Sequence, residues 1–180
     1  IPNRIQLGAG GFGFARALVT GNTDGLGGNL IFGFEHQAYE GPWDSIDEDV
    51  GKTNIQLKQS WERESGKYIL SLMAYENKWS SADQIPHRAV RTGLIGKFGS
   101  IDPTSGGESS RYSLSFALDS DLGAGNLSAS TYVIDYDLTL FQNFSYFSNP
   151  TGDQITQLDD RRVFGGKVVW SLERNWAGKS

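Results

Sequence analysis

The sequence of 180 residues contains no cysteine, which excludes a disulfide framework and any cysteine-based metal or redox site. This composition suits a protein that passes through an oxidising compartment, where free thiols are a hazard. Histidine is nearly as scarce, because His36 and His87 are the only two and lie in different segments. No G-x-S-x-G element accompanies them, so nothing supports a catalytic triad. We therefore expect no catalytic residue, no metal site, no cofactor and no enzymatic activity.

Long hydrophobic runs are also missing, since no stretch of about 18 uncharged apolar residues occurs, and a helical membrane protein is excluded. The mean hydropathy of -0.39 does not exclude the bilayer, because a transmembrane β-strand exposes only every second side chain to lipid. A net charge of -5 argues against a nucleic-acid partner. The chain starts at Ile1 without a visible signal peptide, so we expect a processed or excised product.

What the sequence does contain is a repeated apolar/polar alternation with a period of two, together with 23 glycines and 12% aromatic residues. This period is typical of β-strands that have one buried and one exposed face. Runs of roughly 9 to 12 residues are long enough for a tilted strand to cross a bilayer. We expect seven strands, at residues 11–19, 29–39, 53–62, 68–79, 111–119, 127–141 and 162–173.

The connections between these strands alternate between short and long. Strict alternation in an antiparallel sheet places all short turns at one end and all long loops at the other. Bacterial outer-membrane barrels have this construction. The sequence therefore predicts an all-β fold, an antiparallel up-and-down transmembrane β-barrel with short periplasmic turns and long extracellular loops. The short connections are residues 21–28, 63–66 and 120–125, and the long ones are 40–51, 80–110 and 142–160.

The alternation also assigns side chains to faces. One face of most strands is apolar and the other polar, and aromatic residues lie near strand ends, as interfacial girdles require. The strand at 127–141 mixes both kinds of side chain and is not phased by its pattern. We expect Phe34, Leu72, Leu114 and Phe116 to face lipid, and Gln56, Lys58, Ser71 and Ser113 to face the interior.

Seven strands cannot be a complete membrane structure, because an open sheet leaves unpaired backbone groups in lipid. Single-chain bacterial barrels usually have an even number of strands. A missing eighth strand or a larger barrel would each resolve this. A small eight-stranded structural or adhesin barrel and a soluble β-barrel binder, with one sheet face on a core, remain alternatives.

Two glycine-containing motifs have a structural interpretation. The segment GAGGFG satisfies the letters of a dinucleotide fingerprint, but period-two alternation follows it where a helix should begin. We interpret Gly11, Gly13, Ala15 and Ala17 instead as a flat strand face. Asp24-Gly25 is a strong hairpin signal, because type I′ turns need positive φ at both central positions.

The segment 80–115, SSADQIPHRAVRTGLIGKFGSIDPTSGGESSRYSLS, is the most distinctive part of the chain. It resembles a stretch of the barrel of TonB-dependent outer-membrane receptors that links two strands outside the cell. GPWD at 41–44 and DRRVFGGK at 160–167 also resemble that family. The matching elements of the central motif are DQIP at 83–86, RAV at 88–90, GLI at 93–95, FG at 98–99, IDPT at 101–104, GG at 106–107 and SRY at 110–112.

The resemblance runs over most of the chain and implies a 22-stranded barrel, plugged by an N-terminal domain, in the outer membrane of a Gram-negative bacterium. Such receptors import scarce nutrients, most often a ferric siderophore, with energy from the inner membrane through TonB. The chain contains neither plug nor TonB box. We expect residues 1–180 to be a partial barrel domain, about seven strands and an N-terminal third of the whole, that meets TonB through the absent plug. Its other expected partners are a small-molecule metal chelate and outer-membrane lipid.

Transport of this kind needs no bond chemistry in the receptor, so we expect substrate binding on the long loops, where exposed aromatic and charged side chains are otherwise costly. The alternatives are a rim girdle or loop packing for the aromatic residues, and ion pairs with the acidic loop at 44–49 for Arg88 and Arg91. The candidate substrate-binding residues are Tyr39, Trp43, Trp79, His87, Arg88, Arg91, Phe144, Tyr146 and Phe147.

Overall fold

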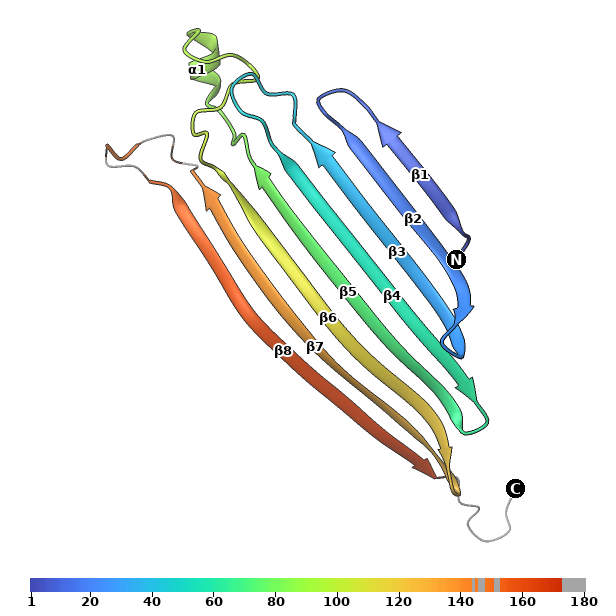
Figure 1. The fold of residues 1–180 in the computed structure, drawn as a ribbon. Coiled ribbons are helices and arrows are strands. Elements are labelled where there is room, and N and C mark those ends of the chain that lie inside the picture. The colour runs from blue at the N-terminus through green and yellow to red at the C-terminus, as the bar shows by residue number, and fades with distance from the viewer. Residues whose placement is uncertain (144, 146–147, 151–152, 173–180) are drawn as a thin grey trace, which may run out of the picture.

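The chain forms one antiparallel sheet of eight strands in the order β1 to β8, so that every strand pairs only with its neighbours in sequence (Figure 1). The computed structural model describes residues 1–143, 145, 148–150 and 153–172. One short helix, α1, lies in the longest loop. The elements are β1 Arg4–Ala9, β2 Ala15–Gly25, β3 Gly28–Tyr39, β4 Val50–Arg63, β5 Gly66–Ser80, α1 His87–Arg91, β6 Gly106–Leu122, β7 Gly125–Gln142 and β8 Ile155–Leu172.

The predicted all-β, up-and-down antiparallel architecture is confirmed. The sheet is open, because within the described residues β1 and β8 each pair along one edge alone. Strands β4 to β8 extend beyond the predicted ranges and reach 18 residues in β7 and β8. Among the described residues, no helix has the length and apolar character needed to cross a bilayer.

The expected number of seven strands is wrong, and so is the first expected strand at 11–19. Phe12 and Gly13 have φ angles of 57° and 67°, which no extended strand contains. They lie in a tight connection in which the Gly10 N–H donates to the Phe14 carbonyl over 2.9 Å. The predicted flat face therefore starts only at Ala15. The strand that precedes this turn, β1, does alternate, with Ile5 and Leu7 between Arg4, Gln6 and Gly8, but its 6 residues are fewer than the roughly 9 to 12 expected of a strand that crosses a bilayer.

The hairpin turn after β2 lies two residues beyond the predicted Asp24-Gly25. Its central residues are Leu26 and Gly27, whose φ angles are 51° and 73°. Positive φ at both positions is the requirement of a type I′ turn. Asp24 is still in the strand, where it pairs with Asn29. The two other turns at this end, residues 64–65 and 123–124, also contain two residues each.

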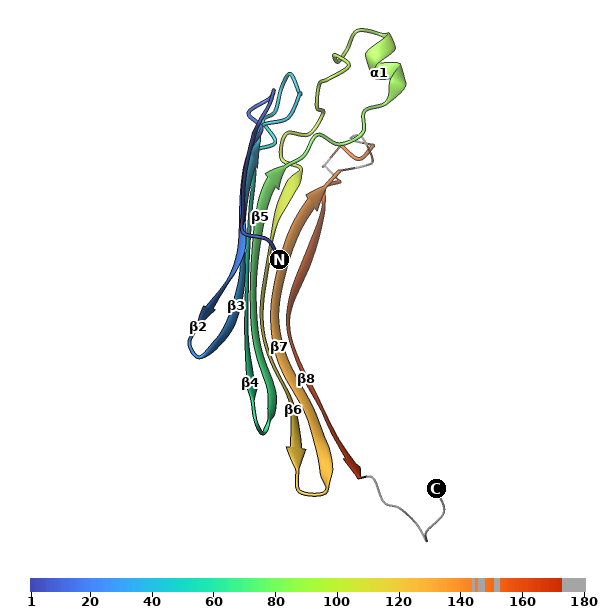
Figure 2. The same cartoon turned by 90° about the vertical axis from the view of Figure 1, so that its right-hand side faces the viewer.

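The other end of the sheet carries the loops 40–49, 81–105 and 143–154, as the alternation predicts, and one short connection, 10–14. In Figure 2 the loop that carries α1 leans to the right, the side toward which the first residues of the chain also turn from β1. Ile1 borders a hollow with the polar side chains of Gln56 and Ser71. The longest loop therefore overhangs the polar face of the sheet.

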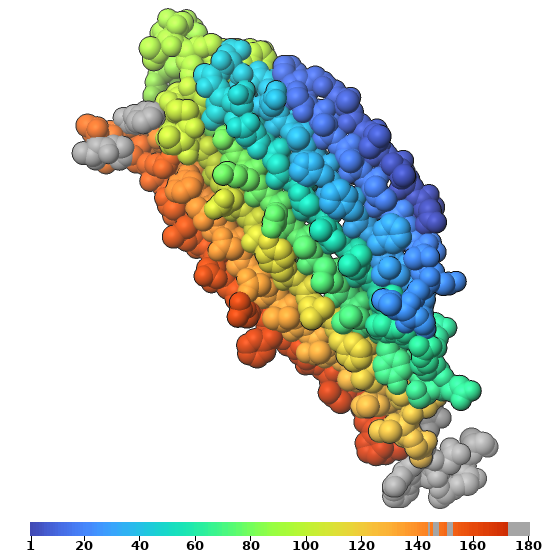
Figure 3. Space-filling view, viewed as in Figure 1, coloured from blue at the N-terminus to red at the C-terminus, as the bar shows by residue number. Residues whose placement is uncertain are grey.

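Within the described residues, the sheet has no hydrophobic core of its own. The only buried apolar side chain there is Ala89 of α1, which is 6% exposed. No second layer of chain covers the face of the sheet seen in Figure 3, which runs from β1 to β8 as a continuous surface. Some other medium or chain must cover the apolar face for the fold to be stable.

Candidate ligand-binding surfaces

The pairing register collects apolar side chains on one face across the sheet. Directly opposed residues share a face in an antiparallel sheet. One such row carries, from β3 to β8, Phe32, Leu57, Leu72, Leu114, Val133 and Phe164. The exposed fraction is 41% for Leu72, 45% for Leu114 and 80% for Phe164. We call the apolar surface built on this row the apolar band.

The pairing register also assigns the two faces of β7, which the sequence pattern of this strand alone did not assign. Leu127, Ala129 and Val133 of β7 lie on the face of the apolar band, opposite Trp170, Val168 and Phe164 of β8. The pattern was ambiguous because Tyr132 and Ile134 stand on the opposite, polar face. The face therefore becomes visible only through the neighbouring strands.

Polar groups border the apolar band at both ends. At the end of the short turns, the Trp61 indole N–H donates to the Leu26 carbonyl over 2.9 Å, and the Gln59 amide donates to the Gly25 carbonyl over 3.0 Å. Toward the loops, Arg162 forms an ion pair with Asp135 at 2.5 Å. Such an apolar span between polar and aromatic margins has the pattern of a lipid-facing barrel wall.

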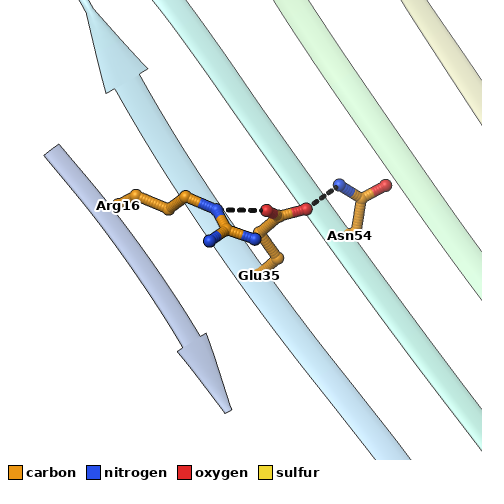
Figure 4. A network of polar contacts seen from close by, with 3 residues as sticks. All are labelled: Arg16, Glu35 and Asn54. Atoms are coloured by element: carbon orange, nitrogen blue, oxygen red, sulfur yellow. Dashed lines mark hydrogen bonds and ion pairs between the residues drawn. The ribbon is translucent and has the colours of Figure 1, made fainter. Parts of the chain in front are cut away.

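The opposite face is polar and carries ionic contacts between strands. Figure 4 shows Arg16, Glu35 and Asn54, from β2, β3 and β4, gathered on one face. The Arg16 guanidinium donates to Glu35 over 2.6 Å, and the Asn54 amide donates to the other Glu35 oxygen over 3.0 Å. Both side chains of the ion pair are half-buried. The contact ties three strands together on a surface that lipid could not solvate.

Positive charge dominates this polar face, although the chain is acidic. Four carboxylates of the polar face lie beside the two-residue turns, namely Asp24, Glu62, Asp119 and Asp121. Farther along the strands, toward the loops, the polar face carries only two carboxylates in the described residues, Glu35 and Asp159. The negative charge near the loops stands on the other face, above the apolar band, at Glu76, Asp137 and Asp160. The cations of the polar face above the turns are Arg4, Arg16, Lys52, Lys58, Arg111, Arg161 and Lys167.

The loops are held together by two carboxylates, Asp102, which is buried, and Asp83, which is half-buried. Asp102 accepts hydrogen bonds from the Thr104 N–H and from the Asn143 side-chain amide, both over 2.9 Å. Asp83 accepts from the Ser105 hydroxyl over 2.6 Å and from the Asn143 N–H over 3.2 Å. Ser105 and Asn143 are buried. These bonds join the loops 81–105 and 143–154 into one unit, which we call the loop cap.

The Thr104 hydroxyl also donates to Asp102, and this hydrogen bond, together with that from the Asn143 amide, holds the pKa of Asp102 below its usual value. Because the folded-state pKa is lowered, the stabilisation is present near neutral pH and is lost as the pH falls below about 4. We expect Asp102→Asn to loosen the loop cap by about 1.5 to 3 kcal/mol, the contribution of hydrogen bonds to a charged group. Limited proteolysis at neutral pH should then cleave the loops of the variant faster than those of the wild type. In the wild type, cleavage should become faster when the pH is lowered.

The matched control is Asp47→Asn, which neutralises an exposed carboxylate in the neighbouring loop. This variant should leave the cleavage rate and its pH dependence unchanged. Equal cleavage of wild type and Asp102→Asn at all pH values would mean that Asp102 does not hold the loops together.

Several predicted binding residues pack within the molecule. The Trp43 indole donates to Glu48 over 2.5 Å, and its ring lies 6.3 Å from that of Phe98. The Tyr39 ring contacts Phe14 at 6.5 Å. Trp79 lies at the end of β5, partly buried beside Gly107. These contacts match the loop-packing alternative. The predicted residues Phe144, Tyr146 and Phe147 lie outside the described residues.

The three basic candidates, unlike the aromatic ones, do not pack within the described part of the molecule. His87, Arg88 and Arg91 lie on α1 and are exposed. Within the described residues neither guanidinium lies within 4.0 Å of a carboxylate, so the expected alternative of ion pairs with the acidic loop is not formed there. A hollow of about 410 Å³ next to Arg88 is lined by Pro86, Ala89, Leu94, Ile95, Ser100 and Ile101.

The sequence interpretation missed the basic polar face as a possible binding surface. Arg111 and Arg161 belong to predicted strands or to their flanking residues, but alternation within one strand does not reveal which side chains of separate strands are neighbours. Strand lengths and turn positions set that register. No group of three or more histidine and acidic side chains suited to a metal ion occurs in the described part.

Comparison of the chain with family models, with curated proteins and with solved structures gives no significant match.

Proposed function

We propose that the chain forms part of the barrel wall of a TonB-dependent active transporter in the outer membrane of a Gram-negative bacterium. The observation that carries this proposal is the pair of opposite faces of one uncovered sheet. The apolar band would form the outer surface of the barrel wall and face lipid, and the polar face of the sheet would line the interior. The motif at residues 83–112 supports the family assignment.

A soluble binder is disfavoured by the missing core. A water-soluble sheet of this size would bury one face against a second layer. Here leucine and phenylalanine side chains across six strands remain exposed on one face. Lipid tails solvate such a face without any second layer, while the β-sheet satisfies its own backbone hydrogen bonds.

A small eight-stranded barrel is the nearest alternative, because the sheet has eight strands. Closing that barrel would require β1 to pair with β8. β1 has 6 residues and β8 has 18, so most of the β8 edge would stay unpaired in lipid. A larger barrel, in which further strands follow β8 and precede β1, avoids this cost.

In the proposed transport, the loop cap captures substrate outside the cell, a plug domain moves under the action of TonB, and the polar face lines the passage. Arg88 and Arg91 are the leading capture residues, because they are exposed and, among the described residues, have no carboxylate within 4.0 Å. Guanidinium groups bind carboxylate and phenolate oxygens in a planar fork. The substrate class that fits is a small anionic metal chelate, such as a ferric siderophore.

We expect Arg88→Ala with Arg91→Ala to weaken substrate capture without loss of folding. Each lost charge-assisted hydrogen bond is worth about 1.5 to 3 kcal/mol, or about 10- to 150-fold in affinity. The measurements are TonB-dependent uptake of an iron-55 catecholate complex by cells, and heat-modifiable migration of the purified natural protein. Uptake should fall, and the migration of the folded barrel should stay unchanged.

Arg63→Ala serves as the control, because it removes an exposed cation at the opposite end of the strands. It should leave uptake unchanged. Wild-type uptake that does not depend on TonB would contradict the transporter assignment. Unchanged uptake by the double variant would instead leave the two arginines without a binding role.

A further inference from the structure

We propose that the loop end of the apolar band binds one phospholipid with a zwitterionic head group, phosphatidylethanolamine. Its phosphate meets Arg162, and its ammonium meets a row of carboxylates one step nearer the loops. Two adjoining hollows on this face of the sheet form the site. The inference deepens the proposed function and rests on it for one point, that this face lies in a bilayer. The selectivity for the head group rests on the side chains alone.

The two hollows meet at Tyr112, which lines both of them on the face of the apolar band. Their volumes fall within the range of about 300 to 1,000 Å³ typical of small-molecule sites. The hollow on the side of the short turns measures about 420 Å³, and its lining on this face includes Leu72, Ala74, Leu114, Val133 and the ion pair of Asp135 and Arg162. The hollow on the side of the loops measures about 410 Å³, and its charged lining residues are Glu76, Lys78, Glu108 and Asp137. An apolar hollow thus continues into a polar one, as the two parts of a lipid require.

The pairing register fixes the order of charges across these hollows. Tyr112 of β6 is opposed to Asp135 of β7, which is opposed to Arg162 of β8. One row nearer the loops, Asp137 is opposed to Asp160. Successive rows of one face are two residues apart, or about 7 Å. A cation at the margin of the apolar band is therefore followed, toward the loops, by carboxylates.

Arg162 is oriented by its neighbour and still accessible to a ligand. Its Nε and Nη2 atoms donate to the same Asp135 oxygen over 2.8 Å and 2.5 Å. These bonds occupy two of the five guanidinium N–H groups, and within the described part of the chain the others make no hydrogen bond. The side chain is 73% exposed. A phosphate oxygen can therefore bind the open side of the guanidinium, whose planar fork suits phosphate.

The carboxylates of the next row are poorly neutralised by the described residues. Asp137 and Asp160 stand directly opposite each other, an arrangement of like charges that destabilises a sheet. Among the described residues, neither has a cation within 4.0 Å. Lys78 is the only cation of the described residues that line the polar hollow, beside three carboxylates. An ammonium group bound in this row would donate to the carboxylates and relieve their repulsion.

The order of these groups selects one kind of head group. In phosphatidylethanolamine the acyl chains are followed by a phosphate and then, after a short carbon linker, by an ammonium. The chains would lie on the apolar hollow, the phosphate at Arg162 and the ammonium among the carboxylates. Phosphatidylglycerol has the same phosphate but presents no cation to the carboxylates, which repel its net negative charge. A neutral sugar lipid supplies neither charge.

The test is native mass spectrometry of the delipidated natural protein in detergent, titrated with phosphatidylethanolamine or with phosphatidylglycerol of the same acyl chains. The wild type should bind phosphatidylethanolamine at least about tenfold more tightly, the equivalent of one hydrogen bond between charged groups. Asp137→Asn with Asp160→Asn should abolish this preference. Asp159→Asn is the matched control, because Asp159 is adjacent in sequence but stands on the polar face. This control should keep the preference of the wild type.

Arg162→Gln should lower the affinity for both phospholipids by about tenfold, because both contain the phosphate. Arg162→Lys keeps the charge beside Asp135 while removing the planar fork, so a smaller loss is expected in a protein that still folds. Arg161→Gln changes the adjacent residue on the opposite face and should alter neither affinity. Heat-modifiable migration checks that each variant is folded.

Ala74→Phe tests the apolar hollow, which the short side chain beside Tyr112 leaves open. The larger ring should fill this space and weaken the binding of both phospholipids equally, since both have the same acyl chains. Ala129→Phe is the control, because Ala129 lies on the same face, opposite Leu118 and Val168 and outside the hollow. It should leave both affinities unchanged.

Equal binding of the two phospholipids by the wild type, tighter binding of a galactosyl diacylglycerol, or an unchanged preference in the double aspartate variant would each overturn the site. Wild-type affinities in Arg162→Gln or in Ala74→Phe would overturn it as well. A preference for phosphatidylethanolamine together with uptake that does not depend on TonB would support this site and reject the transporter. TonB-dependent uptake without that preference would do the reverse.

Discussion

Leu72→Arg is expected to destabilise the protein in a bilayer by about 2 to 4 kcal/mol, the cost of an arginine near the midplane of a lipid-facing barrel surface. Leu72 lies near the centre of the apolar band, between Leu57 and Leu114 on the neighbouring strands. Its side chain is 41% exposed and has no polar partner beside it in the row. The measurement is a folding equilibrium of the natural protein in lipid vesicles, followed by heat-modifiable migration.

Ser71→Arg is the matched control, since Ser71 is adjacent in sequence but stands on the polar face, opposite Lys58 and Ser115. It should cost much less, because water and polar groups can solvate the arginine. Equal destabilisation by the two variants would show that the two faces do not differ in solvent. A larger effect at Ser71 would exchange the lipid and interior faces.

Gly66→Ala is expected to destabilise the protein by at least about 2 kcal/mol, because backbone strain and a steric clash act together. Gly66 begins β5 with a φ of 143°, a conformation that is nearly restricted to glycine. A Cβ atom there would lie 2.2 Å from the Asp119 carbonyl oxygen of β6. The effect should be visible as a lower midpoint in urea-induced unfolding.

Gly123→Ala separates the two causes. Gly123 has a φ of 65°, but a Cβ atom would meet nothing within 4 Å. This variant should cost about 1 kcal/mol, the strain of a left-handed alanine. If Gly66→Ala costs no more than Gly123→Ala, the close approach of β5 and β6 at this point is not as tight as described.

Much of the fold could be predicted because strand alternation is a local property of the sequence. Leu70, Leu72 and Ser71 show their faces within a few residues, and the structure keeps them on those two faces. The errors arose where local signals compete. Asp24-Gly25 has strong turn chemistry, yet the turn forms at Leu26-Gly27, so the strand pairing and not the dipeptide determines its place.

The candidate sites were less accessible to prediction, because they depend on distant pairs. Trp43 is aromatic, and only its contacts with Glu48 and Phe98 identify it as a packing residue. The neighbouring positions of Tyr112, Asp135 and Arg162 in one row likewise require knowledge of two separate registers. A two-residue error at any turn would place other side chains in that row.

The neighbour-only order of the strands also determines how the sheet can assemble. Each new strand needs only the strand before it, through a two-residue turn at one end or a loop at the other. Such neighbour-only pairing permits stepwise zippering along the chain, without a distant partner at any stage. Every intermediate would nevertheless present a growing edge of unpaired N–H and C=O groups, open to pairing with another molecule. A chaperone that guards a strand edge would therefore suit the nascent chain better than one that covers apolar side chains alone.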